Sequence, residues 1–287
     1  MTTIVPGSAS QSLAAALARE LDATLAVPTF DRFPDGETLA AVPQFDDDSA
    51  IVVAATVSND AHIELLQLAD AVCEAGATTV TVVIPYMGYA RQDRAFNDGQ
   101  PVSARAVAAA IDTAADRVVL VNPHEPSIAS FFSTPVETVD AAAHLAEPLP
   151  DALTDPLFLS PDAGAIELAE TVRDSYGQGE TDYFEKDRDY DTGAVDISPS
   201  DATVEGRDVV LVDDIIATGS TMSEAIAVLR DRGAAGVYVT CVHPMLANNA
   251  LAKLSAAGIS AVYGTDTIER SVSEISAAPA IAAVLRS

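Results

Sequence analysis

The feature that most constrains the fold of this chain is an alternation of short β-branched runs with alanine-rich helical stretches along almost its whole length. Strands are predicted near residues 3–5, 51–55, 79–84, 117–121, 156–160, 208–212, 236–242 and 259–263. Helices are predicted over residues 11–21, 61–74, 103–113, 163–174 and 220–232. Strands and helices that alternate in this way form βα units with parallel strands. The pattern therefore predicts an α/β fold with helices flanking parallel sheets.

The two halves of the chain repeat this pattern in the same order. Residues 51–85 and 209–244 each contain an apolar strand, a polar loop, a helix, a Gly-Ala turn and a second strand that ends in proline. Matching positions lie 155 to 158 residues apart. Such a constant offset indicates a duplicated domain. We expect an N-terminal domain over 1–147 and a C-terminal domain over 148–287, with the last helix packing back on the N-terminal domain.

Two segments depart from the alternation. Residues 29–41 contain two short extended runs around Pro34, Asp35 and Gly36, which predict a small hairpin. Residues 177–193 are polar, flanked by glycine and rich in charge, which is typical of a mobile hairpin or loop.

The composition limits the surroundings and partners of the protein. Acidic residues number 43 against 15 basic ones, which gives a net charge of -28 spread over the chain. Because molar salt screens such self-repulsion, we interpret this as a halophilic surface. The alternative is an acidic protein with a basic partner, which would concentrate the acids in one patch. Nucleic-acid binding is disfavoured. Without a signal peptide or a long apolar run, we expect a cytoplasmic protein that binds no membrane.

The two cysteines carry no recognisable metal or redox motif. Cys73 and Cys241 lie in apolar stretches, and neither has a second cysteine or histidine at metal-ligand spacing. We expect both to be reduced residues of the hydrophobic core.

Residues 211–221 have the chemistry of a sugar-phosphate site. Asp213 and Asp214 end a buried strand, and a run of hydroxyl and glycine residues, 218–221, begins the next helix. Backbone amides at a helix N-terminus suit a phosphate, and paired carboxylates accept hydrogen bonds from vicinal hydroxyls. Ligands of open α/β sheets bind at the carboxyl ends of strands. The alternative is a strand end followed by an ordinary helix cap.

This segment resembles the phosphoribosyl-diphosphate loop of the type I phosphoribosyltransferase fold. From about Pro6 to Ala261 the chain resembles the ribose-phosphate pyrophosphokinases, also called PRPP synthetases, and is most similar to archaeal forms. The resemblance implies two duplicated phosphoribosyltransferase-like domains with a flag hairpin. It also implies ribose 5-phosphate binding by Asp213, Asp214, Ala217, Thr218, Gly219, Ser220 and Thr221.

Two N-terminal segments resemble the nucleotide-binding parts of that family. Residues 32–37 resemble its flag, which serves the adenine site of a neighbouring subunit, and residues 85–100 resemble its ATP-binding stretch. Two arginines three residues apart after a strand also form a positive cluster suited to polyphosphate. The alternatives are a simple turn and arginines that pair with local acids. The resemblance implies ATP binding by Phe33, Asp35, Glu37, Arg91, Gln92, Asp93 and Arg94.

Four further residues complete the predicted site. His124 and Asp162 each follow a strand of their own half, and the resemblance implies that they hold the Mg²⁺ of MgATP. Lys186 is one of only two lysines and lies beside Arg188 in the acidic loop 177–193. The resemblance makes this the catalytic loop, in which Lys186 and Arg188 stabilise the transferring group.

The resemblance implies a specific reaction. The anomeric hydroxyl of ribose 5-phosphate attacks the β-phosphorus of MgATP and expels AMP, which gives 5-phosphoribosyl 1-diphosphate. A flag that serves a neighbouring subunit implies a homo-oligomer, at least a dimer. Two alternatives are a phosphoribosyltransferase that consumes this product and a non-catalytic regulatory paralogue. The absence of a Walker A sequence argues against a more familiar phosphotransferase.

Overall fold

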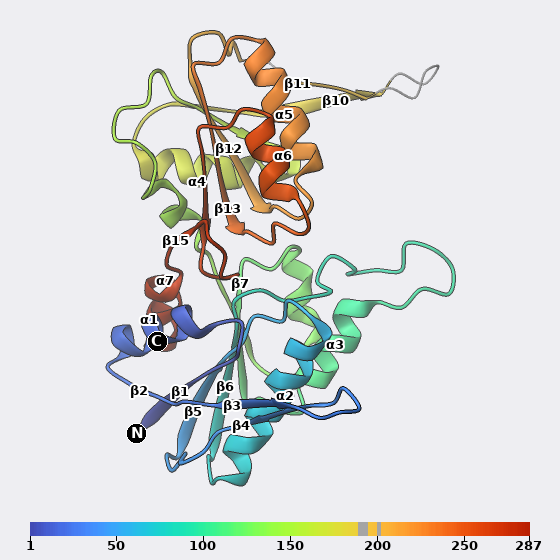
Figure 1. The fold of residues 1–287 in the computed structure, drawn as a ribbon, viewed down its shortest axis with the longest axis vertical. Helices are drawn as coiled ribbons and strands as arrows, with labels where there is room; N and C mark the ends of the chain where they lie inside the picture. Colours follow the sequence, from blue (N-terminus) through green and yellow to red (C-terminus); the bar gives the residue numbers. More distant parts are fainter. Residues whose placement is uncertain (189–194, 200–201) are drawn as a thin grey trace. The chain divides into compact units, whose positions relative to one another are not determined.

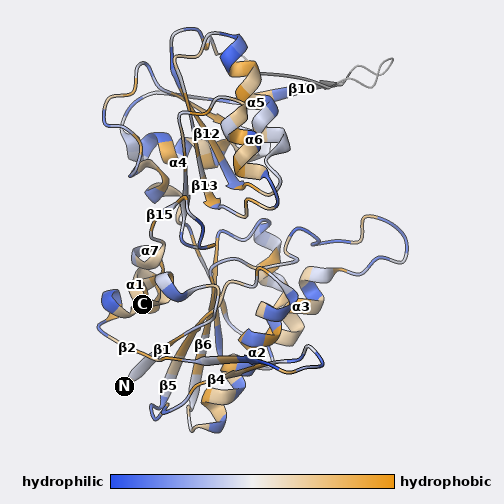
Figure 2. Cartoon of the chain, in the orientation of Figure 1, coloured by the Kyte–Doolittle hydropathy of each residue, from blue (hydrophilic) through white to orange (hydrophobic). Residues whose placement is uncertain are grey.

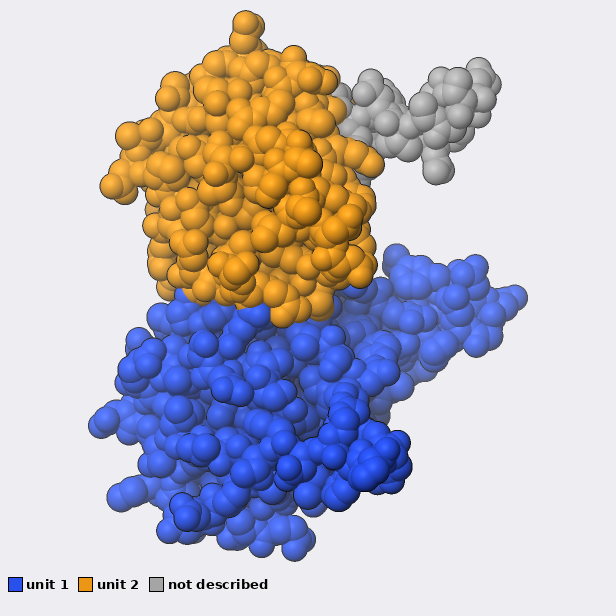
Figure 3. Space-filling model, viewed as in Figure 1, with its two compact units in different colours: residues 1–140, 266–269, 276–287 blue, residues 141–265, 270–275 orange. Residues whose placement is uncertain are grey.

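The structure is a computed structural model that describes residues 1–188, 195–199 and 202–287. It divides into two compact units (Figure 1 and Figure 3). Unit 1 contains residues 1–140, 266–269 and 276–287, and unit 2 contains residues 141–265 and 270–275. Among the described residues, no helix combines the length and apolar character that a membrane span requires.

Unit 1 is built on a parallel sheet with helices on both faces. Its strand order is β2-β1-β5-β6-β7-β8. The strands are β1 (Thr2–Pro6), β2 (Thr24–Leu25), β5 (Ser49–Val53), β6 (Thr79–Ile84), β7 (Arg117–Val121) and β8 (Val136–Val139). Strands buried on both faces are expected to be almost continuously apolar. Figure 2 shows this hydrophobic character along the central strands.

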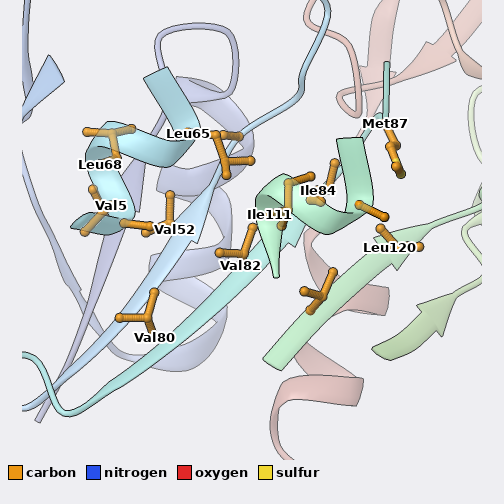
Figure 4. Packing of buried hydrophobic residues seen from close by; sticks show 14 of the residues in the cluster. Val5, Val52, Leu65, Leu68, Val80, Val82, Ile84, Met87, Ile111 and Leu120 are labelled. Carbon is orange, nitrogen blue, oxygen red and sulfur yellow. The ribbon is translucent and has the colours of Figure 1, made fainter. Parts of the chain in front are cut away.

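The core of unit 1 explains why its helical stretches are amphipathic. Helix α2 (Asn59–Glu74) and helix α3 (Ser103–Ile111) turn their apolar residues toward the sheet. Leu65 and Leu68 are fully buried in one cluster with Val52 and Val82 of the strands (Figure 4). The described helix bounds differ by no more than two residues from those predicted for 61–74 and 103–113.

The end of the chain completes unit 1. Helix α7 (Ala278–Leu285) packs against helix α1 (Gln11–Leu21). Glu269 Oε1 accepts hydrogen bonds from the amides of Ser12 and Leu13, at 2.6 and 3.1 Å, in the first turn of α1. A carboxylate in this position satisfies amides that have no partner within the helix. The first and last parts of the sequence are therefore joined in one unit.

The predicted flag hairpin is confirmed. Strands β3 (Thr29–Arg32) and β4 (Thr38–Ala41) pair antiparallel, with Arg32 opposite Thr38. The turn is closed by Phe33 and Glu37, whose backbone amide and carbonyl are 2.8 Å apart. Gly36 has a φ of +96°, which only glycine adopts readily. The side chain of Gln67 on α2 bonds the backbone of Thr38 and Ala40, at 2.8 Å each, and holds the hairpin to unit 1.

Unit 2 repeats the architecture of unit 1. Its strand order is β11-β10-β9-β12-β13-β14-β15, and all neighbours are parallel except the pair of β10 and β11. If β9 is matched with β1, the next four strands follow in the same order in both sheets. This agrees with the predicted duplication. The strands are β9 (Leu157–Ser160), β10 (Glu180–Arg188), β11 (Val195–Pro199), β12 (Asp208–Ile215), β13 (Gly236–His243), β14 (Ala261–Thr265) and β15 (Ser273–Ile275).

The α-helices among the described residues of unit 2 are α4 (Ile166–Tyr176), α5 (Ser220–Asp231) and α6 (Ala250–Ala256). Unit 2 begins at Ala141, before the predicted boundary at 147, because the short 3-10 helix η2 (Ala142–Ala146) packs on α4 and β13.

Two local predictions can be compared with the structure. The segment 177–193, predicted to be a hairpin or loop, begins with strand β10, which pairs antiparallel with β11 as in a hairpin and also parallel with β9. Residues 189–194 of that loop lie outside the described residues. The prediction that both cysteines are core residues is wrong for Cys73, which is exposed on α2, whereas Cys241 is fully buried on β13.

Candidate functional site

The paired acids of unit 2 lie at the carboxyl end of β12, beside the end of β9. Leu211 and Leu159 are register partners in these parallel strands, so Asp213 and Asp162 follow at the same edge of the sheet. Asp162 caps the 3-10 helix η3 (Ala163–Ala165), since its Oδ1 accepts a hydrogen bond of 3.0 Å from the amide of Gly164. The topology therefore gathers three carboxylates of the predicted site in one place.

The surroundings of Asp213 raise the pKa of its carboxyl group. Burial, with the negative charges of Asp214 and Asp162, raises the pKa of Asp213 to about 8. The amide of Asp214 donates to Asp213 Oδ1 at 2.9 Å, but this opposing effect is smaller. Burial and the neighbouring carboxylates thus favour the protonated form of Asp213 near neutral pH. A cation or a set of hydroxyl donors would favour the charged form instead.

The loop after β12 leaves the start of α5 open to an anion. Gly219 is the N-cap of α5 with a φ of +69°, and the described structure shows no side-chain hydrogen bond that caps this helix. A β-carbon on Gly219 would lie 3.2 Å from the β-carbon of Ala250. Glycine is therefore favoured at this position for two reasons: its φ is positive, and a side chain would crowd Ala250. Free amides at a helix N-terminus form a common phosphate site.

Helix α6 and the segment that precedes it form hydrogen bonds with the loop between β12 and α5. The amides of Leu246 and Ala247 donate to the carbonyls of Ile216 and Ala217, each at 2.9 Å. Lys253 Nζ lies 2.9 Å from Ser220 Oγ. Lys253 was not among the residues predicted from sequence. Its available signal was that it is the second of only two lysines.

A small cavity of about 20 Å³ lies beside the same loop in unit 2. Asp213 and Thr221 contribute polar groups to its wall, and Phe184 of β10 lines it as well. The structure thus places Asp162 near Asp213, at the strand edge that leads into residues 217–221. The ligand roles of these residues stay predictions.

Lys186 and Arg188 lie near the end of β10, where they face Ile197 and Val195 of β11 in register. Strand β10 is the neighbour of β9, which leads to Asp162. Only the backbone of these two residues is described. Their catalytic role stays a prediction.

In unit 1, the predicted ATP-binding stretch is tied to the loop after β5. The amide of Thr56 donates to the carbonyl of Tyr86 at 2.9 Å, and Thr56 Oγ1 accepts from the amide of Gly88 at 2.8 Å. A β-carbon on Gly88 would lie only 2.3 Å from the carbonyl oxygen of Thr56. This close approach requires glycine and fixes the path of the chain before Arg91.

The residues of the stretch itself differ in exposure. Arg91 and Arg94 are exposed, and neither forms an ion pair with a described residue. The alternative that they pair with local acids is therefore not supported. Gln92 ties the stretch to the start of α3, because it accepts from Ser103 Oγ at 2.8 Å and donates to Pro101 O at 3.2 Å. Asp93 is partly buried.

His124 follows β7, the parallel neighbour of β6. It is exposed and lies at the sheet edge from which the ATP-binding stretch also begins. His124 belongs to unit 1 and Asp162 to unit 2. Within the described part of the chain, no cluster of three or more histidine, cysteine, aspartate or glutamate side chains is suited to hold a metal ion. The shared magnesium role of His124 and Asp162 stays a prediction.

The flag presents its predicted nucleotide contacts at the turn. Phe33 is 47% exposed, and Asp35 Oδ1 accepts from the amide of Glu37 at 3.1 Å. Arg32 pairs with Asp60 of α2 and donates to the carbonyl of Gly36 at 2.9 Å. These bonds hold the turn so that the ring of Phe33 stays accessible to a partner.

Comparisons with known proteins agree on one family. The model of the N-terminal domain of ribose phosphate pyrophosphokinase matches residues 2–115, and that of the phosphoribosyl transferase domain matches residues 136–273. A ribose-phosphate pyrophosphokinase of Halobacterium salinarum is 58% identical over 283 residues, which are 98% of this chain and 100% of the relative. One from Methanosarcina mazei is 43% identical over 284 residues, or 98% and 94% of the two chains.

The structural comparison gives the same result. The crystal structure of phosphoribosylpyrophosphate synthetase from Mycobacterium smegmatis is similar with a TM-score of 0.82 and 29% sequence identity, over 99% of this chain and 97% of that one. The Halobacterium relative also fits the halophilic surface that the acidic composition predicts. The chain therefore belongs to the ribose-phosphate pyrophosphokinase family.

Proposed function

We propose that this protein transfers the β,γ-diphosphate of ATP to the anomeric hydroxyl of ribose 5-phosphate, which yields 5-phosphoribosyl 1-diphosphate and AMP. The observation that carries the proposal is the end of β12, where the half-buried acids Asp213 and Asp214 precede a helix N-terminus without a side-chain cap. Full-length relatives that carry the name of this activity support it.

Unit 2 supplies the acceptor. Asp213 and Asp214 accept hydrogen bonds from the ribose hydroxyls, and the amides and hydroxyls of Thr218, Gly219, Ser220 and Thr221 bind the 5-phosphate, with Ala217 lining the loop. Donation by ribose hydroxyls offsets the charge repulsion that raises the pKa of Asp213. The environment of Asp213 therefore favours a ligand that donates hydrogen bonds.

Unit 1 supplies the nucleotide site. Arg91 and Arg94 are exposed and bind the polyphosphate, since a guanidinium pairs well with phosphate oxygens. Gln92 and Asp93 belong to the same stretch, and the hydrogen bonds of Gln92 keep its shape. Phe33, Asp35 and Glu37 of the flag contact the adenine nucleotide of a neighbouring copy. The exposed ring of Phe33 offers a surface for base stacking.

The transfer itself needs positive charge around the moving phosphoryl groups. The anomeric oxygen forms a bond to the β-phosphorus while the bond from that phosphorus to the α,β-bridging oxygen breaks. AMP leaves with the bonding electron pair, and the hydroxyl proton is released. Lys186 and Arg188 neutralise charge that develops on the non-bridging oxygens, which contributes most to this class of reaction.

Magnesium fits part of the predicted donor set. The carboxylate of Asp162 is a hard oxygen ligand of the kind Mg²⁺ prefers, whereas the nitrogen of His124 is a less usual partner. The excess negative charge around Asp213 also favours a divalent cation nearby. When bound, Mg²⁺ neutralises phosphate oxygens and orients the polyphosphate.

Two further parts of the proposal concern the oligomeric state and the location of the enzyme. A flag that serves another subunit requires a homo-oligomer, and light scattering in molar KCl should give a mass of at least a dimer. The enzyme is proposed to act in the cytoplasm.

The decisive experiment measures AMP release from ATP with ribose 5-phosphate as the only acceptor, in molar KCl with MgCl₂. The wild type should form AMP and 5-phosphoribosyl 1-diphosphate in equal amounts. Lys186→Ala and Arg188→Ala should each lower kcat about 100-fold, because each removes a transition-state contact. A wild type that forms no AMP, or a Lys186→Ala variant as fast as the wild type, would contradict the proposal. A protein that instead consumes 5-phosphoribosyl 1-diphosphate with a nucleobase would be a phosphoribosyltransferase.

A further inference from the structure

Lys253 is a cation in direct contact with the phosphate loop. It lies on α6, is half-buried, and places Nζ 2.9 Å from Ser220 Oγ and 3.4 Å from the carbonyl oxygen of Thr218. The chain contains only two lysines among 287 residues. One of these two lysines therefore lies beside the loop that is proposed to bind an anion.

The contact with Thr218 orients a peptide group. In a trans peptide the carbonyl and the following amide point in opposite directions. Because Lys253 attracts the carbonyl of Thr218, the amide of Gly219 points away from α6 and remains available to a ligand. A loop that binds an anion needs its amides turned inward and its carbonyls turned away.

The contact with Ser220 orients a hydroxyl. An ammonium group can only donate, so Ser220 Oγ accepts from Lys253 and its own proton is free to be donated elsewhere. A hydroxyl that accepts from a cation is also a stronger donor. The ammonium group thus prepares Ser220 to donate to a phosphate oxygen.

The rest of α6 keeps Lys253 in register with the loop. Ala250, one turn earlier on α6, is the residue that a β-carbon on Gly219 would meet at 3.2 Å. The backbone bonds from Leu246 and Ala247 to Ile216 and Ala217 fix the preceding segment. A lysine near the end of a helix is commonly explained by the helix dipole. That explanation does not account for a 2.9 Å contact with a different helix.

We propose that Lys253 is a positioning residue of the 5-phosphate subsite, which orients the Thr218–Gly219 peptide and the Ser220 hydroxyl toward the phosphate of ribose 5-phosphate. This inference rests on the proposed function, because it assigns the phosphate to this loop. It predicts that Lys253 matters for ribose 5-phosphate and not for ATP. The effect should survive high salt, because a contact of this length is not longer than the screening distance of about 3 Å at 1 M.

The test compares three full-length variants in molar KCl with MgCl₂. Lys253→Met should raise KM for ribose 5-phosphate about tenfold, the loss expected for one charge-assisted contact. KM for ATP and kcat should stay within about twofold of the wild type. Lys253→Arg retains the charge and should raise KM for ribose 5-phosphate less than Lys253→Met does.

Arg232→Met is the matched control. It also removes one positive charge from unit 2, at the exposed position that follows α5, about 18 Å along the helix from the loop. Its KM for ribose 5-phosphate should equal that of the wild type. Equal rises in Arg232→Met and Lys253→Met would overturn the inference, since the effect would then reflect overall charge. An unchanged KM in Lys253→Met, or a loss of kcat and thermal stability without a KM change, would overturn it too.

A binding measurement separates this inference from the proposed function. Ribose 5-phosphate alone should raise the Tm of the wild type and of Arg232→Met, and should raise that of Lys253→Met much less. If the wild type binds ribose 5-phosphate in this way but forms no AMP, the proposed reaction fails while the role of Lys253 stands. If Lys253→Met is protected as well as the wild type, the role of Lys253 fails whatever the reaction.

Discussion

The loop after β5 in unit 1 and the loop after β12 in unit 2 follow matching strands of the two sheets, but they use their polar groups differently. In unit 1 the Ser58 side chain caps α2 by accepting a hydrogen bond of 3.2 Å from the amide of Ala61. In unit 2 the N-cap of α5 is Gly219, which has no side chain to do so. A side chain therefore caps the start of α2, whereas no side-chain hydrogen bond caps the start of α5 in the described structure.

The polar residues that precede α2 and α5 also differ in what they contact. Thr56 is buried and supports the predicted ATP-binding stretch through hydrogen bonds with Tyr86 and Gly88. At the offset of 158 residues, its counterpart is Asp214, the second acid of the pair. The comparison teaches that the duplicated architecture was kept while the loop chemistry diverged. In unit 1 this loop supports a neighbouring loop, and in unit 2 it is proposed to bind ribose 5-phosphate.

The largest expected effect comes from removing the negative charge of Asp214, which has no counterpart in the matching loop of unit 1. Asp214→Asn should lower kcat/KM for ribose 5-phosphate about 100-fold, because it replaces a charged acceptor of hydroxyl protons. Steady-state kinetics with each substrate varied in turn would measure this. Asp231→Asn, at the other end of α5, is the matched control and should behave as the wild type. Equal activity of the two variants would remove the proposed distinction between the loops.

The corresponding test in unit 1 changes the loop that Thr56 supports. Gly88→Ala places a β-carbon 2.3 Å from the carbonyl oxygen of Thr56, so the ATP-binding stretch must move. We expect KM for ATP to rise at least about tenfold and KM for ribose 5-phosphate to change little. Gly76→Ala also lies in unit 1, at a φ of +111° with no atom within 4 Å, and should cost stability alone. A selective effect of Gly88→Ala on ribose 5-phosphate would contradict the assignment of the two units.

A smaller effect concerns stability and pH. The carboxyl of Asp213 titrates at about 8 in the folded protein and near 3.9 when unfolded. Between these values the folded state binds more protons, so this group's contribution to stability falls as pH rises from about 4 to about 8. The Tm of Asp213→Asn minus the Tm of the wild type should therefore be larger at about pH 9 than at about pH 5. Calorimetry without ligands at both pH values would measure the difference, and an equal offset at both would show that Asp213 does not titrate there.

The smallest effect is expected from the cap of unit 1. Ser58→Ala removes the hydrogen bond to Ala61 and should lower the free energy of unfolding by about 1 kcal/mol. This corresponds to a Tm decrease of about 2–4 °C. KM for both substrates should be unchanged, because the cap serves the fold. If KM for ribose 5-phosphate rose, the helix start of unit 1 would also be a ligand site.

Much of the fold could be predicted because local patterns specify it. The eight predicted strands all occur, and α1 has the predicted bounds of 11–21. The edge strands β2, β8, β11 and β15 were missed because they are short and have weak apolar patterns. Cys73 was misassigned because an apolar stretch does not state which face of a helix a residue occupies. The start of α5 at Ser220 was predicted correctly because the hydroxyl and glycine residues that mark a helix start act locally.

The sequence by itself determined the α/β class, the duplication, the flag turn and the chemical character of each strand-end segment, since these follow from periodicity and from side-chain chemistry. Only the tertiary structure decided which groups meet. Thr56 Oγ1 accepts a hydrogen bond from the amide of Gly88, and Lys253 contacts Ser220 across 33 residues of sequence. Burial, followed by the charges of Asp214 and Asp162, raises the pKa of Asp213. The physical reason is that charge interactions and hydrogen bonds depend on distances of a few ångströms. The pairing of strands and the packing of helices set those distances between residues far apart in the chain.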